Sequence, residues 1–303
     1  MTRADNSHKN TSQERLPCSR RHGYVLFTDG TDIDGIGCAI LAKLAFGDDV
    51  NIIYPKYPIR PGIKKFLADH KHEWYPHTYF ITDLWPGNDI ASERVKIFDH
   101  HGHTGSDPHD CGTSSFYNYL VGDNKLQPTK IINSFVELTR LFDTFEWREH
   151  NHDAPYRLHL LFKAWGRERY IKVFLGKLLN NLELFLPEDL ATADVQQKKI
   201  TKICKEIADA SKIVTIDGRQ VMLTECPLMY RNELRDYLFY GTPSADALII
   251  LISDTSLVLY RSLKNDYDIS IISQRFGGSL HPSRDGLRAD GYPNADIFTL
   301  FGK

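Results

Sequence analysis

The sequence predicts an α/β protein in which a mainly parallel sheet is covered by helices on both faces. The first observation is that short apolar segments alternate with segments of helical apolar spacing over residues 23–150. The second is a mostly helical stretch over residues 151–210, and the third is the return of paired strand-like segments from residue 211. The 303 residues suffice for two cores, so we expect a helical connector at 151–210 and a second, smaller α/β domain at 211–303.

The first domain, at 23–150, is expected to alternate strand and helix along the chain. Strands are predicted where the composition is short, apolar and β-rich, at 24–28, 50–57, 77–83 and 95–99. Helices are predicted from apolar spacing at 36–47, 61–70 and 112–122. Gly47 ends the first of these helices, and Pro61 lies in the first turn of the second. Thr113 or Ser114 is expected to cap the third.

The rest of the chain is predicted to form helices and then a second sheet. A packed helix is expected over 131–150 and a long helix with one polar face over 191–212. Asp217-Gly218 indicates a hairpin within 212–225. A helix at 229–241, strands at 245–253 and 256–263, and a short helix at 268–276 are expected to follow. Residues 1–22 are polar, which predicts a disordered N-terminal arm.

Composition and charge exclude several classes of protein. A protein that coats nucleic acid or a membrane surface usually has a strongly basic net charge, whereas the net charge here is −2. We therefore expect no membrane partner and no long duplex DNA. No apolar run approaches the roughly 20 residues of a membrane helix, and we expect no secretory signal. The five cysteines are odd in number and lack a C-x-x-C pair, which predicts reduced thiols in a cytoplasmic protein.

Acidic residues follow three of the predicted strands. Asp32 and Asp34 lie in the loop after the strand that ends at Thr28, Asp83 ends the third strand, and Asp99 ends the fourth. The carboxyl ends of parallel strands border one crevice, so these side chains are expected to face it together. Taken singly, each motif is more often a turn or a helix cap than a metal site.

The whole set changes this balance in favour of a metal site. His100 follows Asp99, and Asp143 lies in an apolar helical stretch where an unpaired carboxylate would be costly. Four carboxylates and one imidazole suit Mn²⁺ or Mg²⁺ better than a thiolate-bound metal. Two such cations that share a bridging carboxylate can activate a water for attack on phosphorus.

The last part of the chain offers groups that could bind a phosphate. A guanidinium, a hydroxyl, an imidazole and a glycine turn come close together in sequence, at Arg261, Ser262, Gly277, Gly278 and His281. The alternative interpretation is that Gly277-Gly278 only ends a helix. The residues alone favour neither the phosphate site nor the helix end.

The ordered motifs resemble those of the DHH–DHHA1 phosphoesterase superfamily, and the resemblance covers most of residues 24–290. It is strongest to the branch of bacterial oligoribonucleases and cyclic-nucleotide phosphodiesterases. The motifs are, in order, TDIDGIGCAILAK, ITDL, KIFDHH, FDTFEW, YRSL and RFGGSLHP.

The resemblance implies two Mn²⁺ ions per chain, with Mg²⁺ as the alternative, and assigns roles to the motif residues. The implied metal ligands are Asp32, Asp34, Asp83 as the bridging ligand, His100 and Asp143. Asp99 would orient His100, and His101 would hold the scissile phosphate or assist the leaving oxygen. The second, DHHA1-like domain would bind the far end of the substrate through Arg261, Ser262, Gly277, Gly278 and His281.

The sequence departs from the family pattern at two places. The family has a histidine just before the aspartates of the first motif, whereas this chain has none there, and Asp29 is the oxygen ligand that could replace it. In the glycine-rich motif, Ser279 and Leu280 precede His281, and Arg284 adds positive charge nearby.

The expected activity is hydrolysis of short oligonucleotides or cyclic (di)nucleotides to mononucleotides by a monomer or homodimer. Two alternatives remain open at the level of sequence. One is a hydrolase of pyrophosphate or polyphosphate. The other is a degenerate, non-catalytic module that binds a nucleotide and regulates a partner.

Overall fold

The computed structural model describes most of the chain in two compact units. The first unit contains the described residues up to His100 and those of His109–Arg140, and the second contains Asp107 and the described residues from Leu141 onward. The predicted N-terminal arm and the predicted helix at 268–276 lie outside the described residues. The residues that the structure describes are 23–56, 59–69, 78–90, 92–100, 107, 109–149, 152–216, 218–241, 245–253, 256–261, 279–280 and 286–290.

The first unit is built on a parallel sheet with the strand order β2-β1-β3-β4. All of its strand pairs are parallel, as predicted, and Leu26 lies beside both Ile52 and Phe80 in the register. The strands are β1 (Tyr24–Thr28), β2 (Val50–Ile53), β3 (Thr78–Thr82) and β4 (Val95–Phe98).

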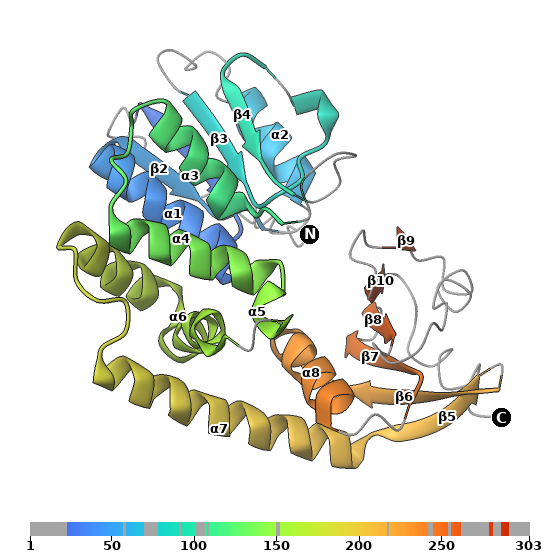
Figure 1. Ribbon diagram of the computed structural model, residues 1–303. Helices are drawn as coiled ribbons and strands as arrows, with labels where there is room; N and C mark the ends of the chain where they lie inside the picture. Colours follow the sequence, from blue (N-terminus) through green and yellow to red (C-terminus); the bar gives the residue numbers. More distant parts are fainter. Residues whose placement is uncertain are drawn as a thin grey trace, which may run out of the picture. The chain divides into compact units, whose positions relative to one another are not determined.

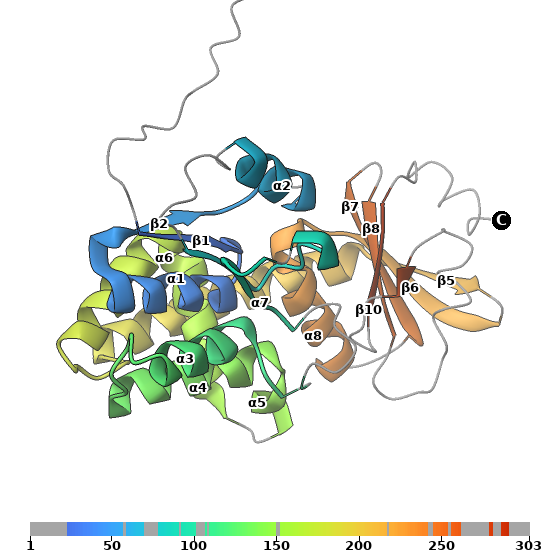
Figure 2. The same cartoon turned by 90° about the horizontal axis from the view of Figure 1, so that it is seen from above.

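Helices cover both faces of this sheet, which confirms the predicted fold class. Figures 1 and 2 show α2 on one face and α1 and α3 on the other. The bounds are α1 (Ile33–Phe46), α2 (Ile59–Asp69), α3 (Gly112–Gly122) and α4 (Lys130–Asp143), with short 3-10 turns at Gly47–Asp49 and Asn88–Ile90.

Alternation along the strands assigns side chains to the two faces. Phe27 of β1 and Ile81 of β3 form one core cluster with Ile63 of α2. Phe80 points to the opposite face, where its ring lies 5.6 Å from that of Phe46 in α1 and 5.3 Å from that of Phe116 in α3. Because successive strand residues point to opposite faces, one strand serves both cores.

Two predicted helix starts differ from those in the structure, and local contacts explain the difference. The first helix begins at Ile33 and not near residue 36, because the side chain of Asp32 caps it. Cys111, and not Thr113 or Ser114, is the cap of α3: its sulfur accepts from the amide of Ser114 at 3.5 Å, and its own amide donates to the Ser114 hydroxyl at 2.9 Å.

The second unit begins with helices and ends in a six-stranded sheet. The helices are α5 (Glu146–Glu149), α6 (Asp153–Leu179), α7 (Pro187–Ala210) and α8 (Arg231–Gly241), with a 3-10 turn at Leu228–Tyr230. The helical content predicted for 151–210 is confirmed by α6 and α7. Gly166 interrupts α6 with a φ of 71°, so that helix is two helices joined at a kink.

The sheet of the second unit has the order β5-β6-β7-β8-β10-β9. Of its described pairs, β6–β7 is parallel and the others are antiparallel. The hairpin predicted within 212–225 is confirmed as β5–β6, whereas β9 and β10 were not predicted. The bounds are β5 (Lys212–Ile216), β6 (Arg219–Glu225), β7 (Ala247–Ser253), β8 (Ser256–Arg261), β9 (Ser279–Leu280) and β10 (Gly286–Asp290).

Among the described residues, no helix combines the length and the apolar character that crossing a membrane demands.

Candidate metal centre

The candidate site lies at the carboxyl ends of neighbouring strands in the first unit. In the order β2-β1-β3-β4, the chain leaves β1 toward β2 and leaves β3 toward β4, so the loops after these two strands diverge. Such a switch point opens a crevice at the sheet edge, where ligands of open α/β sheets bind. Asp32 lies in the loop after β1 and Asp34 in the first turn of α1, Asp83 follows β3, and Asp99 and His100 follow β4.

Three carboxylates form one ligand group. Asp29, Asp32 and Asp83 each offer an oxygen, and these oxygens lie within 4.8 Å of one another. Asp29 directly follows β1 and accepts from the amide of Thr31 at 2.8 Å. One oxygen of Asp32 accepts from the amides of Asp34 and Gly35, both at 3.1 Å, so the cap of α1 fixes this carboxylate.

Asp83 is held in an unusual backbone conformation. Its φ is 50°, a left-handed value that is costly for a residue other than glycine, and it is only 4% exposed. Its amide donates to the carbonyl of Phe98 at 2.9 Å, which ties the end of β3 to the end of β4. The strained residue therefore lies where the chain leaves β3, and its carboxylate is one of the candidate ligands.

A second ligand group contains Asp34 and His100, whose ligand atoms also lie within 4.8 Å of each other. Asp34 is 1% exposed, and its oxygens accept from the amides of Gly112 at 2.8 Å and Thr113 at 2.7 Å. These amides begin α3, so the positive end of that helix stabilises the charge on Asp34. His100 follows β4 by two residues.

Glycines permit this close packing. A Cβ on Gly35 would lie 2.2 Å from the carbonyl oxygen of Asp29, and one on Gly112 would lie 2.9 Å from Oδ2 of Asp34. The contacts of Gly112 and Thr113 with Asp34 were not predicted from the sequence, because they span almost 80 residues.

Carboxylates gathered in this way repel one another. Burial, followed by the charges of Asp29 and Asp34, raises the pKa of Asp32 to about 6. A divalent cation would reverse this balance, because it favours the charged form of every ligand. The hard oxygens and the single imidazole therefore fit Mn²⁺ or Mg²⁺.

The structure brings together most of the predicted ligands but not every predicted site residue. Asp99 is half-buried and directly precedes His100. Asp143 is the last residue of α4 and belongs to the second unit, so its part in the metal centre stays a prediction.

The predicted phosphate-binding set stays untested. Arg261 ends β8, in register with Ala247 of β7. The other predicted residues, together with the catalytic candidate His101, lie outside the described residues: Ser262, Gly277, Gly278, His281 and Arg284.

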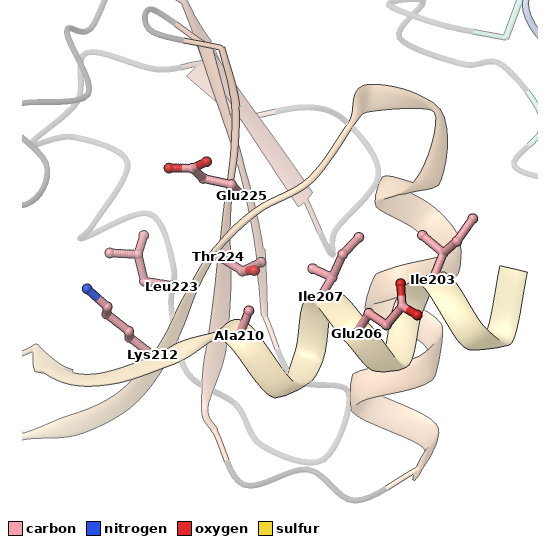
Figure 3. A pocket seen from close by; sticks show the side chains of 8 residues that line it. All are labelled: Ile203, Glu206, Ile207, Ala210, Lys212, Leu223, Thr224 and Glu225. Atoms are coloured by element: carbon pink, nitrogen blue, oxygen red, sulfur yellow. The ribbon is translucent and has the colours of Figure 1, made fainter.

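A cavity of about 390 Å³ lies in the second unit, between the end of α7 and strands β5 and β6. Figure 3 shows Ile203, Ile207 and Ala210 on α7 together with Glu206, whereas Lys212 comes from β5 and the other three side chains come from β6. Two glutamates and one lysine do not make a phosphate site, and no residue of the predicted sets lines it. The lining residues are Ile203, Glu206, Ile207, Ala210, Lys212, Leu223, Thr224 and Glu225.

Comparison with known proteins gives relatives at low identity. No protein-family model matches the chain. Oligoribonuclease NrnB of Bacillus subtilis (strain 168) is 27% identical over 281 residues, which cover 84% of this chain and 70% of the relative. A crystal structure of exonuclease RecJ bound to manganese covers 91% of this chain and 87% of its own, with 12% identity and a TM-score of 0.50.

A second RecJ structure, from Thermus thermophilus and in complex with Mn²⁺, gives a TM-score of 0.54 at 10% identity. It covers 91% of this chain and 50% of its own. At such identities these two structures show a shared fold.

Proposed function

We propose that the chain is a metal-dependent phosphodiesterase of the DHH–DHHA1 superfamily that hydrolyses short oligonucleotides to mononucleotides, a proposal that its similarity to an oligoribonuclease and its RecJ-like fold support. The observation that carries the proposal is the pair of ligand groups at the switch point of the first sheet. The relation to an oligoribonuclease supports short RNA as the substrate class. The small net charge also suits a short substrate better than a long duplex.

In this proposal two divalent cations, Mn²⁺ or Mg²⁺, occupy the candidate centre. Asp29, Asp32 and Asp83 would hold one, and Asp34 and His100 would belong to the other, with Asp143 as a further ligand. The presence of Asp29 in the first group supports its replacing the histidine that the family motif has. Cations bound there supply an activated water and neutralise the charge that develops on the phosphate.

The remaining residues have roles in orientation and substrate binding. Asp99 would fix the ring of His100, as carboxylates do for metal-bound imidazoles. His101 would hold the scissile phosphate or donate a proton to the leaving oxygen. The far end of the substrate would bind the second domain through Arg261, Ser262, Gly277, Gly278 and His281, with Arg284 adding charge.

The test is hydrolysis of a 5′-labelled dinucleotide with Mn²⁺ or Mg²⁺. We expect 5′-mononucleotide release, a metal content of about two ions per chain, and loss of roughly 100-fold or more in kcat for D83N. D49N is the matched control, because Asp49 is an exposed acid in the same unit, outside both ligand groups.

A substrate panel separates the proposal from its alternatives. Phosphate release from pyrophosphate without cleavage of dinucleotides would identify a phosphoanhydride hydrolase. Nucleotide binding without turnover by either metal, with fewer than two ions per chain, would identify a non-catalytic module. Cleavage of a cyclic dinucleotide in preference to a linear one would revise the substrate within the same chemistry.

A further inference from the structure

Thr113, in the first turn of α3, contacts both the main chain and the carboxylate of Asp34. Its amide donates to Oδ1 of Asp34 at 2.7 Å, and its hydroxyl donates to the carbonyl oxygen of Asp34 at 2.6 Å. The amide of Gly112 donates to the other carboxylate oxygen, Oδ2, at 2.8 Å. The start of α3 therefore holds Asp34 through three hydrogen bonds, and Thr113 donates two of them.

These hydrogen bonds fix the orientation of the carboxylate. Each of its oxygens accepts from one amide, so a rotation about the Cβ–Cγ bond of Asp34 would break a short hydrogen bond inside the protein. The bond from the Thr113 hydroxyl to the carbonyl of Asp34 also fixes the start of α1 against the start of α3. The lone pairs of Asp34 that accept from neither amide are therefore held in one direction.

The hydroxyl of Thr113 lies in a space that a glycine leaves open. Thr113 is fully buried, and a Cβ built on Gly37 of α1 would overlap its Oγ1 and lie 3.1 Å from its Cγ2. The Sγ of Cys38 lies 3.7 Å from the same Oγ1. The hydroxyl has a single proton, which the carbonyl of Asp34 accepts, so the thiol is the donor in the contact with Cys38. Because Thr113 is buried, it can affect a bound cation only through its neighbours, of which Asp34 is a candidate ligand.

We propose that Thr113 is a positioning residue whose hydroxyl holds Asp34 in the orientation that binds a divalent cation. This inference rests on the proposed function, because it uses Asp34 as a metal ligand. A ligand that is already oriented loses little freedom when the cation binds. Partners that orient a metal ligand commonly contribute a factor of about 10–100 to the affinity for the metal. Loss of the Thr113 hydroxyl should therefore weaken cation binding although no atom that contacts the cation is changed.

The experiment measures the Mn²⁺ affinity of the full chain by calorimetry, starting from the metal-free protein. T113A removes the hydroxyl, and we expect it to weaken the binding of at least one Mn²⁺ ion by about tenfold. T113S keeps the hydroxyl, and its affinity should stay within about twofold of that of the wild type.

T139A is the matched control for the loss of a buried hydroxyl. Thr139 is as buried as Thr113, lies in the same unit, and donates to the carbonyl of Phe135 at 2.9 Å within α4, outside both ligand groups. In urea unfolding, T139A and T113A should both be less stable than the wild type, because each loses a buried hydrogen bond. The Mn²⁺ affinity of T139A should nevertheless equal that of the wild type.

A double variant separates the hydrogen bond from packing. In G37A/T113A, the new methyl group at position 37 fills the space that the hydroxyl leaves, so this variant also replaces T113A if T113A fails to fold. It restores the packing of α1 against α3 but not the hydrogen bond to Asp34. Its Mn²⁺ affinity should therefore stay about tenfold below that of the wild type. Recovery of the wild-type affinity in G37A/T113A would show that Thr113 only fills space, and it would overturn the inference.

The remaining outcomes distinguish this inference from the proposed function. An unchanged Mn²⁺ affinity in folded T113A, or a loss in T113S as large as in T113A, would overturn the role of Thr113, while dinucleotide cleavage by the wild type leaves the proposed function standing. If the wild type binds Mn²⁺ but cleaves no dinucleotide, the proposed function fails, and a tenfold weaker binding in T113A still supports the role of Thr113 in cation binding.

Discussion

Replacing Gly112 by alanine should damage the metal centre although the substitution adds one methyl group. The new Cβ would lie 2.9 Å from Oδ2 of Asp34 and 2.9 Å from both the amide nitrogen and the Cβ of Asp83. Ordinary van der Waals contact begins at 3.4 Å, so the first turn of α3 must retreat by about 0.5 Å. That movement would stretch the 2.8 Å bond from the Gly112 amide to Asp34.

The magnitude follows from these contacts. Overpacking of a tight site costs about 1–3 kcal/mol, and a weakened hydrogen bond to a buried carboxylate adds to it. We therefore expect G112A to lower the free energy of unfolding by about 2–3 kcal/mol. Because this retreat weakens the contacts that hold Asp34 and Asp83 in place, the affinity for Mn²⁺ should fall by roughly tenfold.

The assay is urea unfolding of the metal-free protein, followed by calorimetric titration with Mn²⁺. G122A is the matched control, because it places the same substitution at the other end of α3, where a Cβ meets nothing within 4 Å. Alanine is the better helix former, so G122A should be neutral or stabilise by up to about 1 kcal/mol. If G112A behaves like G122A in both assays, the close approach of α3 to Asp34 and Asp83 does not hold in solution.

Two further predictions concern charges. D32N should stabilise the metal-free protein, because the raised pKa of Asp32, about 6 against an ordinary 3.8, means that the folded state resists its ionisation. In urea unfolding, the gain in the free energy of unfolding of D32N over the wild type should be absent below about pH 4 and grow to at most about 3 kcal/mol by pH 7. The Mn²⁺ affinity of D32N should fall. A gain in stability that does not depend on pH would contradict this cause. K177M should destabilise by about 3–5 kcal/mol, because Lys177 is buried with Asp189 and donates to the carbonyl of Leu184 at 2.8 Å. In the same unfolding assay, the double variant K177M/D189N should be more stable than K177M. If the double variant is as unstable as K177M, the buried charge of Asp189 is not the cause of the destabilisation.

The candidate centre was partly predictable from sequence. Asp32, Asp34, Asp83 and Asp99 follow strand-like segments, and parallel strands bring their carboxyl ends to one edge of the sheet. The sequence offered Asp29 as a replacement for a missing histidine, and the structure places it with Asp32 and Asp83. Cys111 was missed as the cap of α3, because a thiol is an uncommon cap and the neighbouring Thr113 and Ser114 are preferred ones.

The sequence by itself determined most of the elements and their order, because strand and helix periodicities and turn residues act over a few neighbouring positions. The tertiary structure alone decided which distant groups meet. Asp34 binds the start of α3 almost 80 residues away, Asp83 adopts a left-handed conformation, and β10 joins β8 in the second sheet. These outcomes depend on packing and on pairing between segments far apart in the chain, and no local pattern carries that information.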